Sequence, residues 1–229
     1  MKKVINAVLT VCVVLLAIIC WRSIQDDINF DSDVAYREAH VKARLLQIKA
    51  AEEAFKQQNP EGAYCSDWNV LTEFVKNGQL PIIIKEGVLS DEQMEKGLTE
   101  SKAAEIINSG DAKAIAEYKL EGFRRDTILT NMIQSLYKGQ YTEETIGEIV
   151  YIPYTDNVKF EVETNNGYTT SQGIKVPIFE IRAHYNTYLH DLNAQERANI
   201  IDKEEKLDHY PGLKVGSIDA PNNNAGNWE

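Results

Sequence analysis

The sequence predicts an α+β protein that begins with an N-terminal transmembrane helix, continues with a helical first half and ends with a mainly antiparallel sheet in its second half. Three observations support this class: an uncharged apolar run over residues 4–21, helical periodicity with capping residues from about 34 to 118, and β-branched, alternating segments between 126 and 181. Helices that precede an antiparallel sheet along the chain are typical of α+β proteins.

The first 22 residues have the composition of a membrane anchor. Residues 4–21 carry no charge, and a helix of that length spans about 27 Å, close to the hydrocarbon core of about 30 Å. Lys2 and Lys3 precede the run, and Trp21 and Arg22 end it as an interfacial aromatic and a cation that can snorkel. We therefore expect residues 1–22 to form a cytoplasmic stub and a transmembrane anchor.

Two other fates share this basic start and apolar run. A cleaved signal peptide needs small residues one and three positions before the cut, whereas this run ends in Ala17-Ile-Ile-Cys-Trp-Arg22. Lipidation of Cys20 is disfavoured because Ile19 precedes it rather than a small residue. The uncleaved anchor is preferred, and cleavage and lipidation remain the alternatives.

Charge predicts the orientation of the anchor. The two lysines lie before the span, whereas the segment after it carries four aspartates between positions 26 and 33 and only Arg22 as a cation. Positive charge stays on the cytoplasmic side, so we expect the N-terminus inside and residues 23–229 outside. No later apolar segment approaches the length of a span, since 81–84 is far too short.

Composition limits what the outer part can bind. Residues 23–229 contain 35 Asp and Glu against 21 Lys and Arg, a net charge of −14. Such a surface repels nucleic acid and anionic lipid headgroups, so we exclude both as partners. We expect an acidic linker over 23–33 and an extracytoplasmic α+β region over 34–229, organised as one domain or two small ones. Cys65 is the only cysteine outside the span; a half-buried structural thiol is the preferred interpretation, and an intermolecular bridge is the alternative.

The pattern of the first half is helical. An apolar stripe from Val34 to Phe55 predicts a helix that runs to Gln58 and ends at Asn59-Pro60. Ser66-Asp67 can cap a second helix over 68–76, and 80–84 reads as a short buried strand. Further helical pieces begin at Ser90 and Thr99 and reach about Tyr118, interrupted at two glycines.

The second half favours strands. We expect them over 126–130, 148–152, 159–164 and 175–181, with a polar hairpin loop over 165–173 whose Asn-Gly pair favours a turn. A charged helix opens at Asn193 and extends to about Leu207, and a turn at Tyr210-Pro-Gly leads to a final strand that ends near Ile218.

Residues able to carry chemistry are scattered. None of His40, His184, His190 and His209 shows the spacing of a metal site, and no phosphate-binding or hydrolase motif is present. The aspartates of 26–33 lack the glycine and terminal glutamate of a calcium loop. We therefore predict no catalytic, cofactor-binding or metal site and no cofactor.

Two clusters have open interpretations. Phe123-Arg-Arg-Asp126 can clamp the sheet to a helix by bidentate pairing or recognise a carboxylate, and the clamp is preferred. Tyr185, Tyr188 and Tyr210, with His184 and His190, can line a recognition surface or form a half-buried sheet edge, which is the more common arrangement.

Several stretches resemble those of a family of uncharacterised, single-pass envelope proteins of Bacteroidetes-type bacteria. They are Lys85-Glu-Gly-Val-Leu-Ser-Asp-Glu-Gln93, Glu95-Lys-Gly-Leu-Thr-Glu100, Phe123-Arg-Arg-Asp-Thr127, Tyr210-Pro-Gly-Leu-Lys-Val-Gly-Ser217 and Asn223-Asn-Ala-Gly-Asn-Trp-Glu229. The resemblance covers nearly the whole chain. It implies a single-pass protein of the inner (cytoplasmic) membrane with its C-terminal domain in the periplasm, and it implies no activity.

A weaker resemblance is to type IV pilins and to the anchored assembly proteins of pilus and secretion machines. Gln47-Ile-Lys-Ala-Ala-Glu-Glu-Ala-Phe-Lys56 and Gly62-Ala-Tyr64 are similar to pilin segments that follow a hydrophobic helix and precede a sheet. The chain departs from pilins at the start of the apolar run, which lacks a small residue followed by Phe or Met and a Glu five residues later.

These observations favour a membrane-anchored binding or scaffold protein of a cell-envelope assembly, with no catalytic activity. Its expected partners are other envelope proteins, including copies of itself through the Val34–Phe55 stripe, and the membrane through residues 4–21. The stripe spans only about three heptads, so packing on the protein's own core is its preferred use. The alternatives are an anchored periplasmic enzyme, hydrolase-like, using dispersed acids such as Glu180 or Asp191, and a pilin-like filament subunit.

Overall fold

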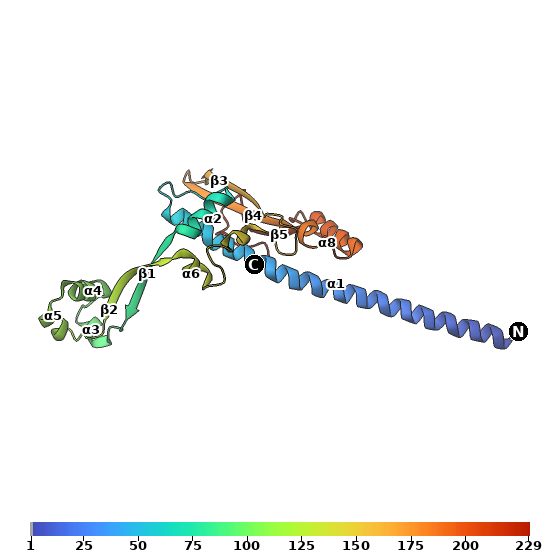
Figure 1. The fold of residues 1–229 in the computed structure, drawn as a ribbon, viewed down its shortest axis with the longest axis horizontal. Helices are drawn as coiled ribbons and strands as arrows, with labels where there is room; N and C mark the ends of the chain where they lie inside the picture. The colour runs from blue at the N-terminus through green and yellow to red at the C-terminus, as the bar shows by residue number, and fades with distance from the viewer. Residues whose placement is uncertain (1) are drawn as a thin grey trace. The chain divides into compact units, whose positions relative to one another are not determined.

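The computed structural model describes residues 2–229 and has the expected α+β class, with a long apolar helix at the N-terminus and antiparallel sheets later in the chain (Figure 1). The chain divides into two compact units. Unit 1 comprises residues 1–74 and 142–229, and unit 2 comprises residues 75–141. The prediction of one domain or two small ones over 34–229 did not foresee that unit 2 is inserted into the sequence of unit 1.

Helix α1 (Lys2–Gln58) is continuous over 57 residues and is drawn from blue to cyan in Figure 1. The helix expected to begin near Val34 therefore begins much earlier, and the predicted linker over 23–33 is helical. The physical reason is that no glycine or proline interrupts residues 2–58, so nothing in this stretch breaks the helical hydrogen bonds. Asn59-Pro60 follows the last turn, as expected.

The two halves of α1 have different surroundings. Apolar side chains from Leu9 to Trp21 are exposed, and within the described residues α1 is the one helix long and apolar enough to cross a membrane. The orientation is predicted from Lys2 and Lys3, whose side chains lie outside the described part of the structure. Met1 lies outside the described residues. Burial begins at Phe30 and continues through Val41, Leu45 and Ile48. The apolar stripe thus packs on the protein's own core.

The sheet of unit 1 has the order β3-β4-β5 and is antiparallel throughout. Its strands are β3 (Glu161–Thr169), β4 (Lys175–His184) and β5 (Gly212–Gly216). The C-terminal half of α1 packs on β4 and β5. The outer edge of β5 is covered by the C-terminal tail, through a bridge between Val215 and Gly226.

Two predictions in this region are wrong. The strand expected over 148–152 is instead the 3₁₀ helix η1 (Ile146–Val150), with Tyr151 making a single bridge to Lys159. Its buried residues, Ile146, Ile149 and Val150, recur at helical rather than alternating spacing. The hairpin loop expected over 165–173 is shorter, because β3 continues to Thr169 through an irregularity between Asn165 and Tyr168.

Three helices complete unit 1. They are the part of α2 (Trp68–Asn77) up to Phe74, the short α7 (Tyr185–Tyr188), and α8 (Ala194–Lys206). Asn193 caps α8 by accepting hydrogen bonds from Gln195 and Glu196, which confirms the predicted start of the helix.

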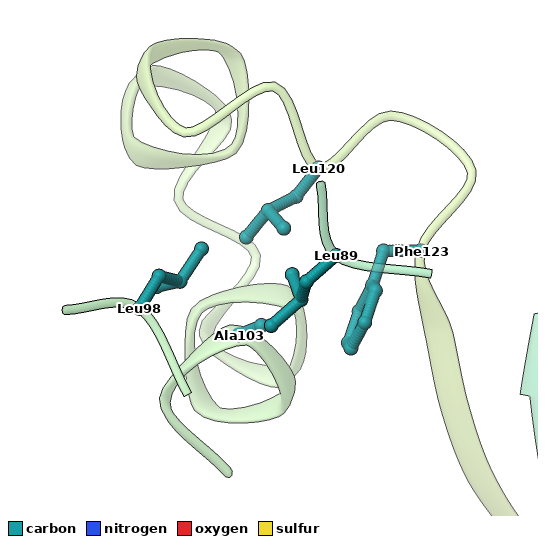
Figure 2. Packing of buried hydrophobic residues seen from close by; sticks show 5 residues of the cluster. All are labelled: Leu89, Leu98, Ala103, Leu120 and Phe123. Atoms are coloured by element: carbon teal, nitrogen blue, oxygen red, sulfur yellow. The ribbon is translucent and has the colours of Figure 1, made fainter. Parts of the chain in front are cut away.

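Unit 2 consists of a two-stranded antiparallel ribbon with short helices. The strands are β1 (Gln79–Glu86) and β2 (Arg124–Asn131). The helices are α3 (Asp91–Glu95), α4 (Glu100–Ser109), α5 (Ala112–Glu117) and α6 (Met132–Tyr137). Ser90 and Thr99 open α3 and α4 as expected, and Gly110 ends α4 in the left-handed conformation. Figure 2 shows the small core packed by α4 and α5 and the loops beside them, made of Leu89, Leu98, Ala103, Leu120 and Phe123.

Candidate interaction surface at the end of α1

The last turns of α1 and the first turns of α2 enclose an open apolar groove in unit 1. Its volume is about 660 Å³, and it is lined by Phe55, Asn69, Val70, Glu73 and Phe74. The rings of Phe55 and Phe74 meet edge to face with centroids 5.0 Å apart, a favourable arrangement for aromatic pairs. The side chain of Val70 is 49% exposed. An open apolar depression of this kind suits the apolar side chains of a protein partner.

A second cleft, of about 310 Å³, lies on another side of the same helix end. The amide nitrogen of Asn224 donates to Glu53 Oε1 and to the Tyr64 hydroxyl, each at 3.1 Å. Lys56 Nζ lies 3.5 Å from the same hydroxyl and 4.8 Å from the centroid of the Tyr64 ring. The C-terminal tail, which carries Asn224, thereby contributes to the surface at the end of α1.

The connection from α1 to α2 is fixed by a buried acid. Glu52 is fully buried, and its Oε2 accepts the backbone N–H of Cys65 at 2.9 Å. Its Oε1 has no hydrogen-bond partner among the described residues. Burial raises the pKa of Glu52 to about 7, against the smaller opposing effect of the Cys65 hydrogen bond. Tyr64, which precedes Cys65, exchanges two hydrogen bonds with the side-chain amide of Asn166, at 2.8 and 3.1 Å.

Cys65 is more deeply buried than the half-buried thiol that the sequence suggests, and it has a structural environment. Its Sγ donates to the carbonyl of Asp67 at 3.2 Å. Burial raises the pKa of the thiol, and the nearby Glu52 contributes in the same direction. A thiol held in its protonated form is a poor nucleophile, so this environment does not favour a catalytic role.

The two acids named for an enzymatic alternative, Glu180 and Asp191, have different structural partners. Glu180 is buried on β4, where its two carboxyl oxygens lie 3.2 Å from Arg182 and 2.8 Å from Lys214. Arg182 also pairs with Glu161 and Glu163 on β3. These ion pairs, with the hydrogen bond to Glu161 as the largest contribution, raise the pKa of Arg182. One oxygen of Glu180 is therefore engaged along β4 by Arg182, and the other across the sheet by Lys214 of β5.

Asp191 instead holds the loop after α7 against α1. The guanidinium of Arg37 donates to both carboxyl oxygens of Asp191, at 2.5 and 2.8 Å, and to the carbonyl of Tyr188 at 2.8 Å. It also lies 5.0 Å from the centroid of the Tyr154 ring. The hydrogen bonds from Arg37 lower the pKa of Asp191 to about 2. This geometry is that of a clamp between α1 and the domain.

The tyrosine and histidine cluster expected near the end of β4 is mostly half-buried, and its His190 is exposed. Tyr188 is fully buried, with no hydrogen-bond partner for its hydroxyl among the described residues, whereas the Tyr185 hydroxyl donates to Glu38 at 3.3 Å. His184 caps α7 by accepting the N–H of Asn186. The arrangement agrees with a half-buried sheet edge.

The other candidate residues have local structural partners. His40 contacts the Tyr36 carbonyl and the Tyr154 hydroxyl, His190 contacts the Thr187 carbonyl, and His209 lies beside Glu204. Over residues 2–229, side chains of His, Cys, Asp and Glu form no group of three or more that could hold a metal ion.

In unit 2, the segment 123–126 lies at the start of β2, and hydrogen bonds from Arg125 connect it to the end of β1. Arg125 donates to the carbonyls of Glu86 and Gly87, at 2.8 and 3.1 Å, and lies 4.0 Å from the centroid of the Phe123 ring. It also donates to the carbonyl of Arg124 at 2.8 Å and lies 3.5 Å from Glu100 of α4. This geometry agrees with the clamp interpretation, although backbone carbonyls rather than a bidentate carboxylate provide most of the contacts.

The sequence interpretation missed Glu52, and a signal for it existed. Ile48, Ala51 and Phe55 lie on the inward stripe of α1, and Glu52 lies between them in the helical repeat. An acid on an apolar face indicates a buried carboxyl. The groove gave no such signal, because it depends on how α1 and α2 meet.

Comparisons of the chain with protein-family models, with curated proteins and with solved structures find no match. The resemblances to the Bacteroidetes-type envelope family and to pilins therefore stay predictions.

Proposed function

We propose that the protein is a membrane-anchored binding or scaffold module of a bacterial cell-envelope assembly, single-pass in the inner membrane, with its N-terminus inside and its C-terminal domain in the periplasm. The observation that carries the proposal is the continuity of α1, whose exposed apolar first half and buried second half belong to one uninterrupted helix. Such a helix connects an anchor to a folded domain without a flexible joint.

The place where the domain begins supports this role. Phe30 is buried, and Arg37 holds the loop at Asp191. Phe30 follows Trp21 by only nine positions, a distance of about 13 Å along a helix. The domain is thus held near the membrane surface, where it can meet other membrane-bound components.

The apolar groove at the end of α1 supports binding. Its lining from Phe55, Val70 and Phe74 is open to solvent and mostly apolar, which suits the apolar side chains of a protein partner. The acids named for the enzymatic alternative, Glu180 and Asp191, are already paired with cations. Glu52 has a raised pKa but is fully buried, so a substrate reaches it only if the connection at Cys65 moves.

A pilin-like filament subunit is the second candidate, and the packing of α1 favours it. The buried half of α1 lies on an antiparallel sheet and its exposed half is apolar, which is the order of elements in the pilins that the chain resembles. The missing processing features at the start of the apolar run argue against it. Long polymers of the purified protein, seen by electron microscopy, would favour this candidate.

The proposal is tested by fractionation and capture with a C-terminally tagged full chain. We expect the protein in the inner-membrane fraction after alkaline extraction, with the tag digested by protease once the outer membrane is opened. Mild-detergent capture through the tag is expected to recover other envelope proteins. Recovery of the protein alone at monomer size, or a tag protected from protease until the inner membrane is lysed, contradicts the proposal.

A further inference from the structure

The ribbon of unit 2 leaves apolar side chains and strand edges uncovered. Ile82 on β1 lies opposite Ile128 on β2, and their side chains are 39% and 42% exposed. Leu129, which faces the other side of the ribbon, is 66% exposed. A ribbon of only two strands is marginally stable in water, and among the described residues each of its strands is paired along one edge only.

The hydrogen-bond phase shows which backbone groups point outward. The N–H of Met132 donates to the carbonyl of Gly78 at 3.0 Å, in the same register as the ribbon. In an antiparallel ladder such bonded pairs alternate with pairs whose N–H and C=O groups point away from the partner strand. On β2 the outward groups therefore belong to Arg125, Thr127 and Leu129. Among the described hydrogen bonds outside the strand ladders, none reaches the backbone of Thr127 or Leu129.

The two edges of the ribbon differ in one respect. On β1 the outward position opposite Leu129 is Pro81, which has no N–H to donate. Proline at an edge hinders the addition of another strand. The edge of β2 has no proline, so it is the edge that can accept one.

Charge argues that the added strand comes from a second copy. Unit 2 contains nine Lys and Arg against ten Asp and Glu, a net charge of −1, whereas the rest of the chain carries the remaining −10. Two copies of unit 2 therefore meet without the repulsion that opposes contact between copies of unit 1. A membrane anchor on each copy also keeps both on one side of the bilayer and raises their effective concentration.

We propose that two copies associate through their β2 edges, antiparallel about Thr127, to form a four-stranded sheet in the order β1-β2-β2-β1. Arg125 of each copy then pairs with Leu129 of the other. The contact is two-fold symmetric and closed, because the edges that remain are the two that carry Pro81. This inference deepens the proposed function, on which it rests for the common anchoring of both copies, by naming a second copy as a partner.

Cross-linking of the full chain in membranes tests the pairing. The background is Cys12→Ala with Cys20→Ala, which leaves only the buried Cys65. Thr127→Cys is then compared with Ser101→Cys, an exposed position on α4 of the same unit. With a short bismaleimide, we expect the Thr127→Cys protein to give about ten-fold more covalent dimer. Equal yields at the two positions, or no dimer at either, overturn the proposal.

A backbone substitution provides the second arm. Because the N–H of Thr127 points outward, Thr127→Pro leaves the bonds between β1 and β2 in place and reproduces on β2 what Pro81 does on β1. We expect about ten-fold or more weaker association, measured by energy transfer between labelled copies in liposomes, while Thr127→Val associates like the wild type. Undiminished association of Thr127→Pro overturns the proposal, and the cross-linking comparison decides it if that variant does not fold.

Fractionation of the same samples separates failure of the pairing from failure of the proposed function. Membrane-bound protein without the cross-link at Thr127→Cys contradicts only the pairing. Protein that leaves the membrane fraction, yet cross-links at Thr127→Cys when concentrated, contradicts only the anchored role.

Discussion

The carboxyl group of Glu52 accepts the backbone N–H of Cys65 at 2.9 Å, and its other oxygen is buried without a hydrogen-bond partner among the described residues. This single contact joins the buried face of α1 to the connection that leads into α2. A buried carboxyl with one hydrogen bond is costly to ionise. The corner between α1 and α2 is therefore more stable when the carboxyl group of Glu52 is protonated.

The first prediction concerns pH and stability. The pKa of Glu52 is about 7 in the folded protein against an ordinary value of 4.5. Between these values the folded protein holds a proton that the unfolded chain has lost, so the free energy of unfolding falls as pH rises from 4.5 to 7 and the loss is complete above 7. The decrease is on the order of 3 kcal/mol, measured by urea unfolding across this range.

Glu52→Gln removes this dependence, because an amide keeps the acceptor for Cys65 and does not ionise. We expect the variant to be more stable than the wild type at pH 8 by about 2 kcal/mol. Glu61→Gln, at an exposed acid of the same corner, serves as the control with the wild-type profile. A pH profile of Glu52→Gln parallel to that of the wild type contradicts the assignment.

The clamp between Arg37 and Asp191 gives a second prediction. Arg37→Ala removes the hydrogen bonds to Asp191 and Tyr188 and the contact with the Tyr154 ring, so it should cost about 1–3 kcal/mol in unfolding free energy. Asp191→Asn should cost less, about 1 kcal/mol or under, because Asp191 is half exposed. The contribution of the Asp191 charge is present above pH 3.8 and is lost as pH falls through 2. Equal losses of unfolding free energy in the two variants would contradict the larger contribution of Arg37.

A third prediction concerns close packing at the end of β5. Gly216 has φ of +77°, and a Cβ there would lie 2.2 Å from the Phe179 carbonyl oxygen. Gly216→Ala should therefore lower the unfolding free energy by more than about 2 kcal/mol. Gly147→Ala is the matched control, since a Cβ at that position meets nothing within 4 Å, and it should change stability by less than about 0.5 kcal/mol. Similar denaturation midpoints for the two variants contradict the packing.

The apolar groove gives a fourth prediction. Val70→Asp should reduce recovery of envelope proteins in the tagged capture by about ten-fold or more, because it places a charge in the lining. The protein should remain folded, since Val70 is half exposed. Val158→Asp is the control, because Val158 is 44% exposed in the same unit but does not line the groove. Capture that falls equally in both variants would assign the effect to charge rather than to the groove.

The sequence predicts the fold best where a local pattern decides the structure. Asn193 and Thr99 cap helices because their side chains accept N–H groups of the first turn, and this depends on a few neighbouring residues. Strand β4 is recognisable from its β-branched run. The element at Ile146 is not, because an apolar segment of that length fits a strand or a helix turn equally well until its burial pattern is known.

The surface at the end of α1 is less accessible to such reasoning. The groove requires Phe55 of α1 and Phe74 of α2 to meet, which is a tertiary contact between residues nineteen positions apart. The continuity of α1 was hidden by the four aspartates after Trp21, whose polarity suggests a linker. In a helix their charges lie on the solvated surface, and no glycine or proline is present to break it.

The central claim is that α1 remains uncleaved and joins the membrane to the folded domain. The intact mass of the protein extracted from membranes tests it most directly. We predict the mass of the full chain, 25.9 kDa. A mature protein that begins near Arg22 would contradict the account.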